Sequence, residues 1–367
     1  MLLHDTEVPI RVELPEDRSY SIVFRPHAAL PVLMREQGLR PGRCLLVTDK
    51  NVAAHYIEGI DVALKEDGWE PMVLVLPAGE QTKSTEHLHA IYDAALSWGI
   101  DRKTPILTIG GGVIGDLTGY AASTLLRGVP LVHVPTSLIA QVDSAIGGKT
   151  GINREQGKNL VGTFYQPVLV CIEPKSLYTL PRREWHSGLA EVVKHALIAD
   201  VAFFDWIEDE IDRIVARDPG VVTDLVYRAA SIKAKVVSED EKEQGIRAIL
   251  NFGHTFAHAL ERCLGYGLFT HGEAVTLGMR AALYLSRRYN RKVDHVRAVS
   301  LLERLPHPPV PSGFSNSALS DAMKTDKKRD AESLRFVLLK EIGKAYTTDT
   351  VSDEDVNAAW SFALKRP

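Results

Sequence analysis

The chain has 367 residues, and its 43 lysines and arginines against 47 acidic residues give a formal charge of 43 − 47 = −4. Hydrophobic residues make up 45% and charged residues 25%, a composition that is typical of folded globular proteins and excludes intrinsic disorder. The near-neutral charge excludes a nucleic-acid-binding protein that works through bulk positive charge, but it allows a small cationic pocket for an anionic metabolite.

The cysteines and the N-terminal segment indicate the compartment. Cys44, Cys171 and Cys263 are far apart in sequence and odd in number, so they form neither a disulfide framework nor a thiolate metal site. Acidic residues stand near the N-terminus, where a signal peptide has basic ones. No apolar run approaches the roughly 18 residues of a membrane span. We therefore expect a cytoplasmic protein that does not bind membranes.

The first half of the chain alternates between strand-like and helix-like patterns. Residues 10–15 and 20–26 predict an antiparallel hairpin at the edge of a sheet. The β-rich runs that follow are 44–49, 71–77, 105–112 and 130–135, and the helical stretches between them include 51–68 and 84–99. Near-continuous apolar strands that alternate with helices are typical of a parallel sheet covered on both faces.

The pattern becomes mostly helical after about residue 176. Apolar residues recur three and four apart in segments 183–200, 203–217, 219–239, 247–264, 273–289 and 293–304, and a strand at 334–343 precedes a final helix at 352–365. The sequence therefore predicts an α/β protein with an N-terminal Rossmann-like parallel-sheet domain, residues 1–176. A C-terminal, mostly α-helical domain, residues 177–367, follows it, and ligands are expected in a cleft between the two.

A glycine-rich turn joins one predicted strand to the next helix. Gly110, Gly112 and Gly115 satisfy the pattern G-x-G-x-x-G, which suits close approach of a pyrophosphate to a helix N-terminus. Alone the pattern is weak, because it lies late in the α/β half and no acidic residue follows about twenty positions later. A simple strand–helix turn is nearly as good an interpretation. Two other signals favour NAD+: Asp49 at the end of an earlier strand, where a carboxylate can accept hydrogen bonds from ribose hydroxyls, and the polar loop 78–84. They indicate a placement of the cofactor that differs from the standard Rossmann pattern.

A second glycine cluster includes Lys149. It resembles a P-loop, but Asp143 stands where that motif requires glycine, so the P-loop interpretation fails. We expect a flexible turn that presents Lys149 and is followed by Lys158 and Asn159. Their hydrogen-bond donors suit the phosphate of a small substrate.

Three clusters in the helical half contain typical metal ligands. The pairs are Glu191 and His195, His254 and His258, and His271 and Glu273. Residues four apart share a helix face, and nitrogen and carboxylate ligands suit zinc with coordination positions left open for substrate. A single buried histidine is more often a hydrogen-bonded core residue, but three such clusters favour a metal site. Spacing alone does not select the ligands, although it favours His254 with His258.

Several long motifs taken together resemble the 3-dehydroquinate synthase family. They are residues 134–153, 157–167, 180–198, 249–261 and 271–279, and they occur in the family's order over nearly the whole chain. The resemblance implies metal ligands at Glu191, His254 and His271, for zinc or cobalt. It makes His258 a substrate or proton-transfer residue instead of a ligand.

The resemblance also implies where NAD+ binds. Combined with the glycine turn, the cofactor contacts fall on Asp49, Glu80, Lys83, Gly111, Gly112, Gly115, Asp116, Thr136, Ser137, Lys149, Lys158, Thr179 and Leu180. Relatives often have threonine at position 137, and serine keeps the hydroxyl group.

Substrate contacts follow from the same motifs. The substrate phosphate is expected near Lys149, Asn159, His258 and one of Lys327 and Lys328, with Lys324 close by. The substrate carboxylate is expected near Lys233, Arg247 and Asn251. The ring hydroxyls are expected near Asp143 and Lys194. Arg127 matches an arginine that reaches the neighbouring subunit's site, which implies a homodimer.

The implied activity is that of a carbon–oxygen lyase of the shikimate pathway. It converts 3-deoxy-D-arabino-heptulosonate 7-phosphate to 3-dehydroquinate and phosphate by transient oxidation with NAD+, phosphate elimination, re-reduction and intramolecular aldol closure. The nearest alternatives are a 2-deoxy-scyllo-inosose or 2-epi-5-epi-valiolone synthase, which share the NAD+ and metal framework but only part of the carboxylate-binding set. A polyol-type dehydrogenase, which would accumulate NADH, and a non-catalytic binding homologue are further alternatives.

Overall fold

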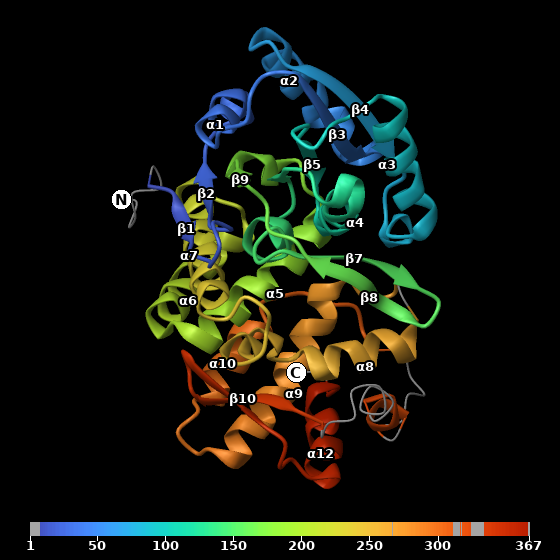
Figure 1. Ribbon diagram of the computed structural model, residues 1–367. Helices are drawn as coiled ribbons and strands as arrows, with labels where there is room; N and C mark the ends of the chain where they lie inside the picture. Colours follow the sequence, from blue (N-terminus) through green and yellow to red (C-terminus); the bar gives the residue numbers. More distant parts are fainter. Residues whose placement is uncertain (1–7, 266, 311–315, 317, 324–333, 366–367) are drawn as a thin grey trace. The chain divides into compact units, whose positions relative to one another are not determined.

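The structure is a computed structural model that describes residues 8–265, 267–310, 316, 318–323 and 334–365 (Figure 1). The chain divides into two compact units. Unit 1 contains Met1–Leu180 and Lys233–Lys242, and unit 2 contains Pro181–Ile232 and Glu243–Pro367. Helix α7 (Pro219–Glu239) therefore begins in unit 2 and ends in unit 1. The domain boundary after residue 176 stays a prediction.

Unit 1 is built on a seven-stranded sheet with the order β1-β2-β9-β6-β5-β3-β4. All neighbouring strands are parallel except β1 and β2, which form the predicted antiparallel pair at the edge. The strands are β1 (Ile10–Val12), β2 (Tyr20–Phe24), β3 (Arg43–Asp49), β4 (Glu70–Leu76), β5 (Ile106–Gly110), β6 (Leu131–Pro135) and β9 (Leu169–Ile172). The predicted parallel sheet is confirmed, and β9 is an additional strand that the sequence pattern did not predict.

The sheet is covered on both faces, which explains its apolar strands. Leu45 and Val47 of β3 pack in one core cluster with α3 (Thr85–Ser97) and α4 (Gly112–Thr124). Cys44 and Leu46 pack in a second cluster with α1 (Leu30–Glu36) and α2 (Lys50–Glu66). Because successive side chains of a strand point to opposite faces, burial on both sides requires an unbroken apolar run.

The strand order reverses beside β3. From β3 the chain passes to β4 on one side and then crosses to β5 on the other side. Ligands of open α/β sheets bind at the carboxyl ends of the two strands that flank such a switch point. Asp49 ends β3 and Gly110 ends β5, so the two sequence signals for a dinucleotide lie at the carboxyl ends of the two strands that flank the switch point.

Lys149 follows the expected turn at Gly147 and Gly148, which both have positive φ, and it begins a β-hairpin that the sequence pattern did not predict. Strands β7 (Lys149–Arg154) and β8 (Gly157–Phe164) pair antiparallel. Leu160, Val161 and Phe164 of β8 are exposed.

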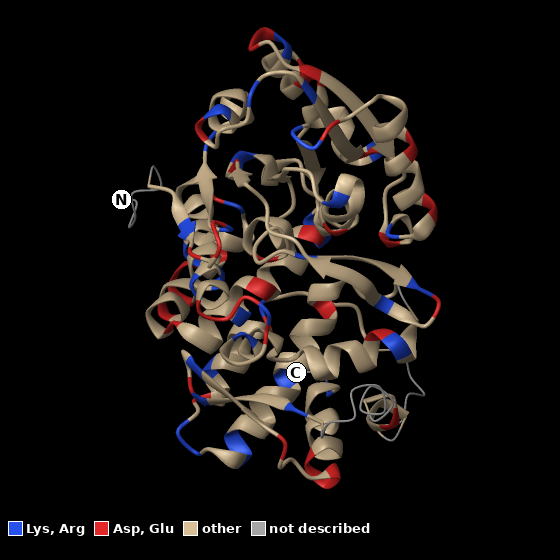
Figure 2. Ribbon diagram, viewed as in Figure 1, with Lys and Arg blue, Asp and Glu red and all other residues tan. Residues whose placement is uncertain are grey.

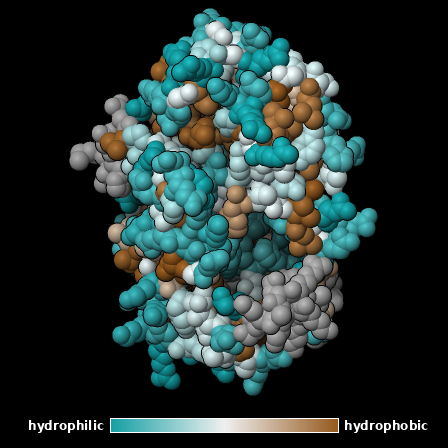
Figure 3. All heavy atoms as spheres, in the orientation of Figure 1, coloured by the Kyte–Doolittle hydropathy of each residue, from teal (hydrophilic) through white to brown (hydrophobic). Residues whose placement is uncertain are grey.

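On the face drawn in Figure 3 most side chains are hydrophilic and the hydrophobic ones form separate patches. Lysines and arginines are likewise interspersed with acidic residues in Figure 2.

Unit 2 is a helical assembly around α9 (His271–Tyr289). This helix packs against α5 (Arg182–Ala199), α8 (His254–Leu264), α10 (His295–Leu302) and α12 (Asp353–Ala363). Helix α6 (Val201–Val215) packs on α5. The late strand is confirmed as β10 (Phe336–Glu341), and it pairs with β11 (Lys344–Thr348). Among the described residues, no helix combines the length and the apolar content that crossing a membrane requires.

The single helix predicted for residues 247–264 is interrupted. A 3-10 turn, Ile246–Asn251, comes first, and α8 begins only at His254. Gly253 separates them with φ +82°, a left-handed conformation that favours glycine. The interruption makes His254 the first residue of its helix instead of an interior one.

Candidate active site

Three side chains from three helices of unit 2 come together at one point. Glu191 lies in the middle of α5, and His254 and His271 are the first residues of α8 and α9. Glu191 Oε1 is 3.8 Å from His254 Nε2 and 3.5 Å from His271 Nε2. One ligand atom from each residue lies within 4.8 Å of the others, so the three can share one metal ion.

Two glycines of α9 allow these helices to approach so closely. A Cβ atom at Gly272 would lie 1.9 Å from the carbonyl oxygen of Ser187 on α5. A Cβ atom at Gly278 would lie 2.1 Å from the carbonyl oxygen of Gly253, directly before His254. Backbone therefore packs on backbone at both contacts, which brings the three ligands together.

A backbone carbonyl lies beside the second ring nitrogen of His254, and a carboxylate lies beside that of His271. His254 Nδ1 lies 3.3 Å from the Phe252 carbonyl oxygen; because a carbonyl only accepts, Nδ1 carries the proton and Nε2 faces Glu191. His271 Nδ1 lies 3.8 Å from Glu261 Oε1 on α8, on the opposite side of the ring from Glu191. Metal-binding histidines commonly pair their second nitrogen in this way. Sequence reasoning missed Glu261; its position two helical turns after His254 was the available signal.

The electrostatics of the cluster suit a divalent cation. Glu191 is completely buried, and among the described residues its Oε1 has no hydrogen-bond partner, whereas Oε2 pairs with Lys194. Burial would raise the pKa of Glu191, but Lys194 and His271 hold it well below its usual range. Burial would lower the pKa of His271, but Glu191 and Glu261 raise it to about 10. Burial and Lys194 lower the pKa of His254. A buried carboxylate oxygen facing two imidazole nitrogens therefore fits zinc or cobalt.

Of the other candidate ligands, His258 and Glu273 are not in this group, whereas a ligand atom of His195, also on α5, lies within 4.8 Å of one on Glu191. His258, which spacing alone paired with His254, is exposed, and the two rings lie perpendicular with centroids 5.6 Å apart. The spacing-based pair is therefore wrong for the geometry that the structure shows. Glu273 instead forms a capping box with Thr270 and an ion pair with Arg183, which explains this acidic residue without a metal.

In unit 1, α4 begins at the glycine turn with Gly111 as its N-cap residue, and no side-chain cap hydrogen bond is made there. A Cβ atom at Gly111 would lie 3.2 Å from Ser137 Oγ, and one at Gly112 would lie 3.0 Å from Ser144 Oγ. A Cβ atom at Gly115 would meet only His133, at an ordinary 3.7 Å. Backbone N–H groups at a helix N-terminus attract anions, so the turn can bind a pyrophosphate.

The polar residues expected around NAD+ are held by hydrogen bonds within unit 1. Asp49 caps α2 by accepting from the backbone N–H groups of Asn51 and Val52. Lys83 is buried and donates to Asp116 over 2.5 Å. Burial raises the pKa of Asp116 even though Lys83 opposes the shift. The remaining contacts are Glu80 with Asn153, Thr179 with Tyr56, Leu180 N with Leu177 O, and Thr136 N with Gly110 O.

Residues expected at the substrate lie in both units. In unit 1, Lys233 donates to the Asp143 carbonyl oxygen over 2.6 Å and also to its carboxylate. Lys149, Lys158 and Asn159 lie on the β7–β8 hairpin. Asn159 has φ +56°, and its N–H donates to Asn153 Oδ1 over 3.0 Å.

Unit 2 carries the other expected substrate residues. Arg247 and Asn251 lie on the 3-10 turn before α8; Arg247 is buried, and Asn251 donates to Glu243 over 2.6 Å. Lys324, Lys327 and Lys328 fall outside the described residues. The roles of all these side chains stay predictions.

Comparison with solved structures defines the class of protein. The chain is similar to 2-epi-5-epi-valiolone synthase from Streptomyces hygroscopicus subsp. jinggangensis, whose structure has NAD+ and Zn2+ bound. The two match with a TM-score of 0.86 and 30% identity, over 96% of this chain and 99% of that one. A 2-deoxy-scyllo-inosose synthase complexed with carbaglucose-6-phosphate, NAD+ and Co2+ matches with TM-score 0.84 and 25% identity over 96% of this chain and 99% of that one. The fold is therefore that of the sugar phosphate cyclases.

Sequence comparison narrows the class to one family. Residues 73–187 match the 3-dehydroquinate synthase N-terminal model and residues 188–329 match the C-terminal model. A 3-dehydroquinate synthase from Salinibacter ruber is 54% identical over 350 residues, 95% of each chain. One from Nitrosomonas europaea is 46% identical over 346 residues, 92% of each chain. The chain belongs to the 3-dehydroquinate synthase family, as the sequence motifs predicted.

Proposed function

We propose that this chain converts 3-deoxy-D-arabino-heptulosonate 7-phosphate to 3-dehydroquinate and phosphate. The observation that carries the proposal is the intact cluster of Glu191, His254 and His271 in a chain 54% identical to a 3-dehydroquinate synthase over 95% of its length. The reaction belongs to the shikimate pathway and so to aromatic amino acid biosynthesis, and the enzyme is a carbon–oxygen lyase that acts on a phosphate ester. We propose that it works in the cytoplasm.

The cofactors proposed are NAD+ and one Zn2+ or Co2+ ion. Solved structures similar to this chain contain NAD+ with Zn2+ and NAD+ with Co2+. The orphaned Oε1 of Glu191 and the two imidazoles would hold the cation, and the crevice between β3 and β5 would hold NAD+. When bound, the cation lowers the pKa of a hydroxyl group on the substrate and NAD+ supplies a hydride acceptor that is regenerated.

The side chains of the protein would bind the two anionic groups of the substrate. Lys149, Asn159 and His258 are proposed for the phosphate, and Lys233, Arg247 and Asn251 for the carboxylate. Asp143 and Lys194 are proposed for the ring hydroxyls. Lys233 and Asp143 already form an ion pair within unit 1, and Lys194 pairs with Glu191 within unit 2. These pairs hold the side chains in fixed orientations, which favours catalysis by positioning and electrostatics.

A phosphate-release assay on a panel of sugar phosphates tests this proposal. With NAD+ and Zn2+ or Co2+, the heptulosonate phosphate should release phosphate without net accumulation of NADH. His271→Ala should abolish release, and His89→Ala, which changes an exposed histidine of α3, should not. A preference for a sugar phosphate that lacks the carboxylate group would contradict the proposal in favour of another sugar phosphate cyclase. A steady rise in NADH absorbance would indicate a dehydrogenase.

We also propose that the chain forms a homodimer in which Arg127 reaches the partner's site. Arg127 is exposed. Its φ is +69° and that of Leu126 is +51°, and two successive non-glycine residues in this left-handed region are energetically costly. The exposed apolar side chains of β8 favour a partner surface as well. Mixing inactive Arg127→Ala and His271→Ala chains should restore activity in dimers that contain one intact site. No recovery in verified mixed dimers would contradict this role.

A further inference from the structure

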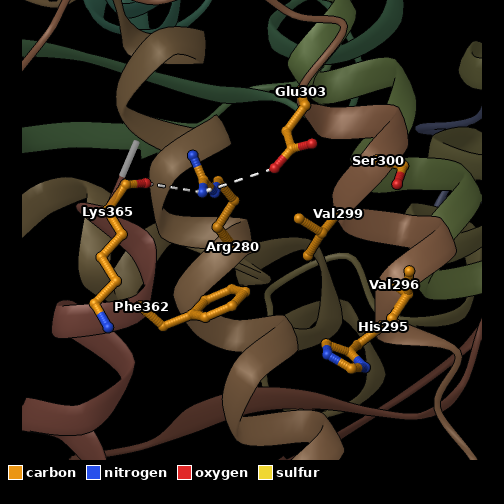
Figure 4. A pocket seen from close by; sticks show the side chains of 8 residues that line it. All are labelled: Arg280, His295, Val296, Val299, Ser300, Glu303, Phe362 and Lys365. Atoms are coloured by element: carbon orange, nitrogen blue, oxygen red, sulfur yellow. Dashed lines mark hydrogen bonds and ion pairs between the residues drawn. The ribbon is translucent and has the colours of Figure 1, made fainter. Parts of the chain in front are cut away.

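A cavity of about 360 Å³ lies within unit 2, among α9, α10 and α12. Its lining includes Arg280 of α9, residues 295, 296, 299 and 300 of α10, and Phe362 of α12, with Glu303 and Lys365 just beyond the helix ends. Figure 4 shows Arg280 between Glu303 on one side and Lys365 on the other, with Val299 and Phe362 nearby. None of these residues has a place in the reaction proposed above.

Arg280 is the central cation of this cavity. It is only 5% exposed. Its Nη2 donates to the Lys365 carbonyl oxygen over 3.1 Å, but the nearest carboxylate oxygen, of Glu303, is 3.9 Å away and beyond hydrogen-bond distance. Within the described part of the chain, its Nε is buried without a hydrogen-bond partner. An arginine has five donors in a planar fork, and in this buried guanidinium at least the Nε donor has no partner within the described chain.

The charges around the cavity are predominantly positive. Of the described residues that line it, Glu303 carries the one carboxylate, against the positively charged side chains of Arg280 and Lys365. A second hollow of about 270 Å³ shares His295 and Phe362 and is lined also by Tyr284, Arg287 and Arg288. Arg288 pairs with Asp355, whereas Arg287 donates to a backbone carbonyl. The groove along this face of α9 therefore has more cationic than anionic groups.

Apolar side chains form the rest of the wall. Val296 and Val299 on α10 face Phe362 on α12 across the cavity, and the Phe362 ring lies 5.4 Å from that of Tyr284. A ligand that fits this arrangement has one anionic end for the guanidinium and an apolar body for the wall. A planar carboxylate matches the arginine fork with two parallel hydrogen bonds. The nearby Glu303 carboxylate disfavours a more highly charged phosphate.

We propose that this cavity is a second binding site, for a small organic monocarboxylate with an apolar or aromatic body. The carboxylate binds the Arg280 guanidinium, and the body packs on Val299 and Phe362. The site is distinct from the metal cluster, whose residue on the same helix, His271, lies 280 − 271 = 9 positions earlier along α9.

Calorimetric titration of the full chain, loaded with metal and NAD+, tests the proposal with 3-phenylpropionate as the probe. It should bind with one site per chain, and the neutral analogue 3-phenylpropan-1-ol should bind at least about tenfold more weakly because it lacks the charge. Arg280→Gln should weaken the binding of 3-phenylpropionate at least about tenfold. The matched control Arg304→Gln removes an exposed arginine of the same unit that pairs with Asp212 and should change nothing.

A second variant covers the case in which Arg280→Gln fails to fold. Ser300 is exposed at the cavity wall, so Ser300→Trp should block the cavity while the circular dichroism spectrum and Tm stay close to wild type. Loss of 3-phenylpropionate binding in this variant supports the proposal. The proposal would be overturned if the wild type did not bind 3-phenylpropionate, or if the alcohol bound equally well. It would also be overturned if Ser300→Trp left binding unchanged, or if inorganic phosphate bound at this site as tightly as the carboxylate.

Discussion

Replacing Gly272 with alanine should disrupt the metal cluster without changing any ligand. Alanine is the better helix former by about 1 kcal/mol, so the change would stabilise a helix that had room for it. Here the new Cβ atom would lie 1.9 Å from the Ser187 carbonyl oxygen, and about 3.0 Å is the closest approach that real Cβ atoms show. The backbones of α9 and α5 must therefore separate by at least 3.0 − 1.9 = 1.1 Å.

That displacement is large for a metal site. It moves His271, the neighbouring residue, relative to Glu191 on α5, whereas ligand distances in metal sites hold within about 0.2 Å. Overpacking of this kind costs about 1–3 kcal/mol, and no side-chain rotation relieves a clash with backbone. If the strain falls on the ligand geometry, about 3 kcal/mol corresponds to a loss in metal affinity on the order of 100-fold.

Titration with Co2+, followed by its visible absorption, measures this loss directly. Thermal unfolding with and without the metal gives a second measurement, because a ligand that binds the folded state stabilises it by an amount that grows with the logarithm of its affinity. Gly59→Ala is the matched control: Gly59 lies on α2, and within the described chain no atom lies within 4 Å of the new Cβ. The control should raise stability slightly and leave Co2+ affinity unchanged. Wild-type affinity in Gly272→Ala would refute the argument from close packing.

Three further predictions concern charge. Glu261→Gln should lower Co2+ affinity by about 10–100-fold, since it removes the carboxylate beside His271 Nδ1, while CD spectra stay unchanged. Co2+ affinity should rise about tenfold per pH unit between about pH 7 and 9. The pKa of His271 is about 10, so its imidazole is protonated in this range and Co2+ must displace the proton in order to bind. Measuring the number of protons released on binding, in two buffers, checks this prediction. Lys83→Met should destabilise the chain by about 2 kcal/mol in urea titrations, and adding Asp116→Asn should recover much of the loss.

The parallel sheet could be predicted because its strands are buried on both faces. Segments 44–49 and 130–135 are almost entirely apolar, and they agree with β3 and β6 to within a residue at each end. The hairpin of β7 and β8 was missed because its strands are rich in glycine and polar residues, and of the two strands only β7 contributes a residue, Ile152, to a core cluster of the described chain. Its pairing is decided by contacts between strands, which a local pattern does not contain.

The interrupted helix at 247–264 shows a different limit. Apolar residues continue at helical spacing through the interruption, so periodicity predicts one helix. The structure ends the first turn at Asn251 and restarts at His254, with Gly253 in a left-handed conformation. A glycine within a helical pattern allows this interpretation but does not require it. Packing of Gly278 against the Gly253 carbonyl favours the interruption of the helix. That contact joins residues that are 278 − 253 = 25 positions apart, which a local pattern does not contain.

The metal ligands illustrate why spacing along one helix was insufficient. Glu191 is 254 − 191 = 63 positions from His254 and 271 − 191 = 80 from His271, so no helical period relates them. Local spacing instead favoured His254 with His258, which share a helix but do not both face the carboxylate. The long motifs selected the three residues that the structure brings together, and the motifs of His254 and His271 also carry the glycines of the close helix contact, Gly253, Gly272 and Gly278.

Charge balance explains why this cluster suits an anionic substrate. With His271 protonated, the side chains of Glu191, Glu261, Lys194 and His271 sum to −1 − 1 + 1 + 1 = 0. With a divalent cation in place of that proton, the sum is −1 − 1 + 1 + 2 = +1. The surplus charge lies beside fully buried groups, where solvent screens it little. Metal binding would therefore convert a neutral cluster into one that attracts a sugar phosphate, even though the chain as a whole carries −4.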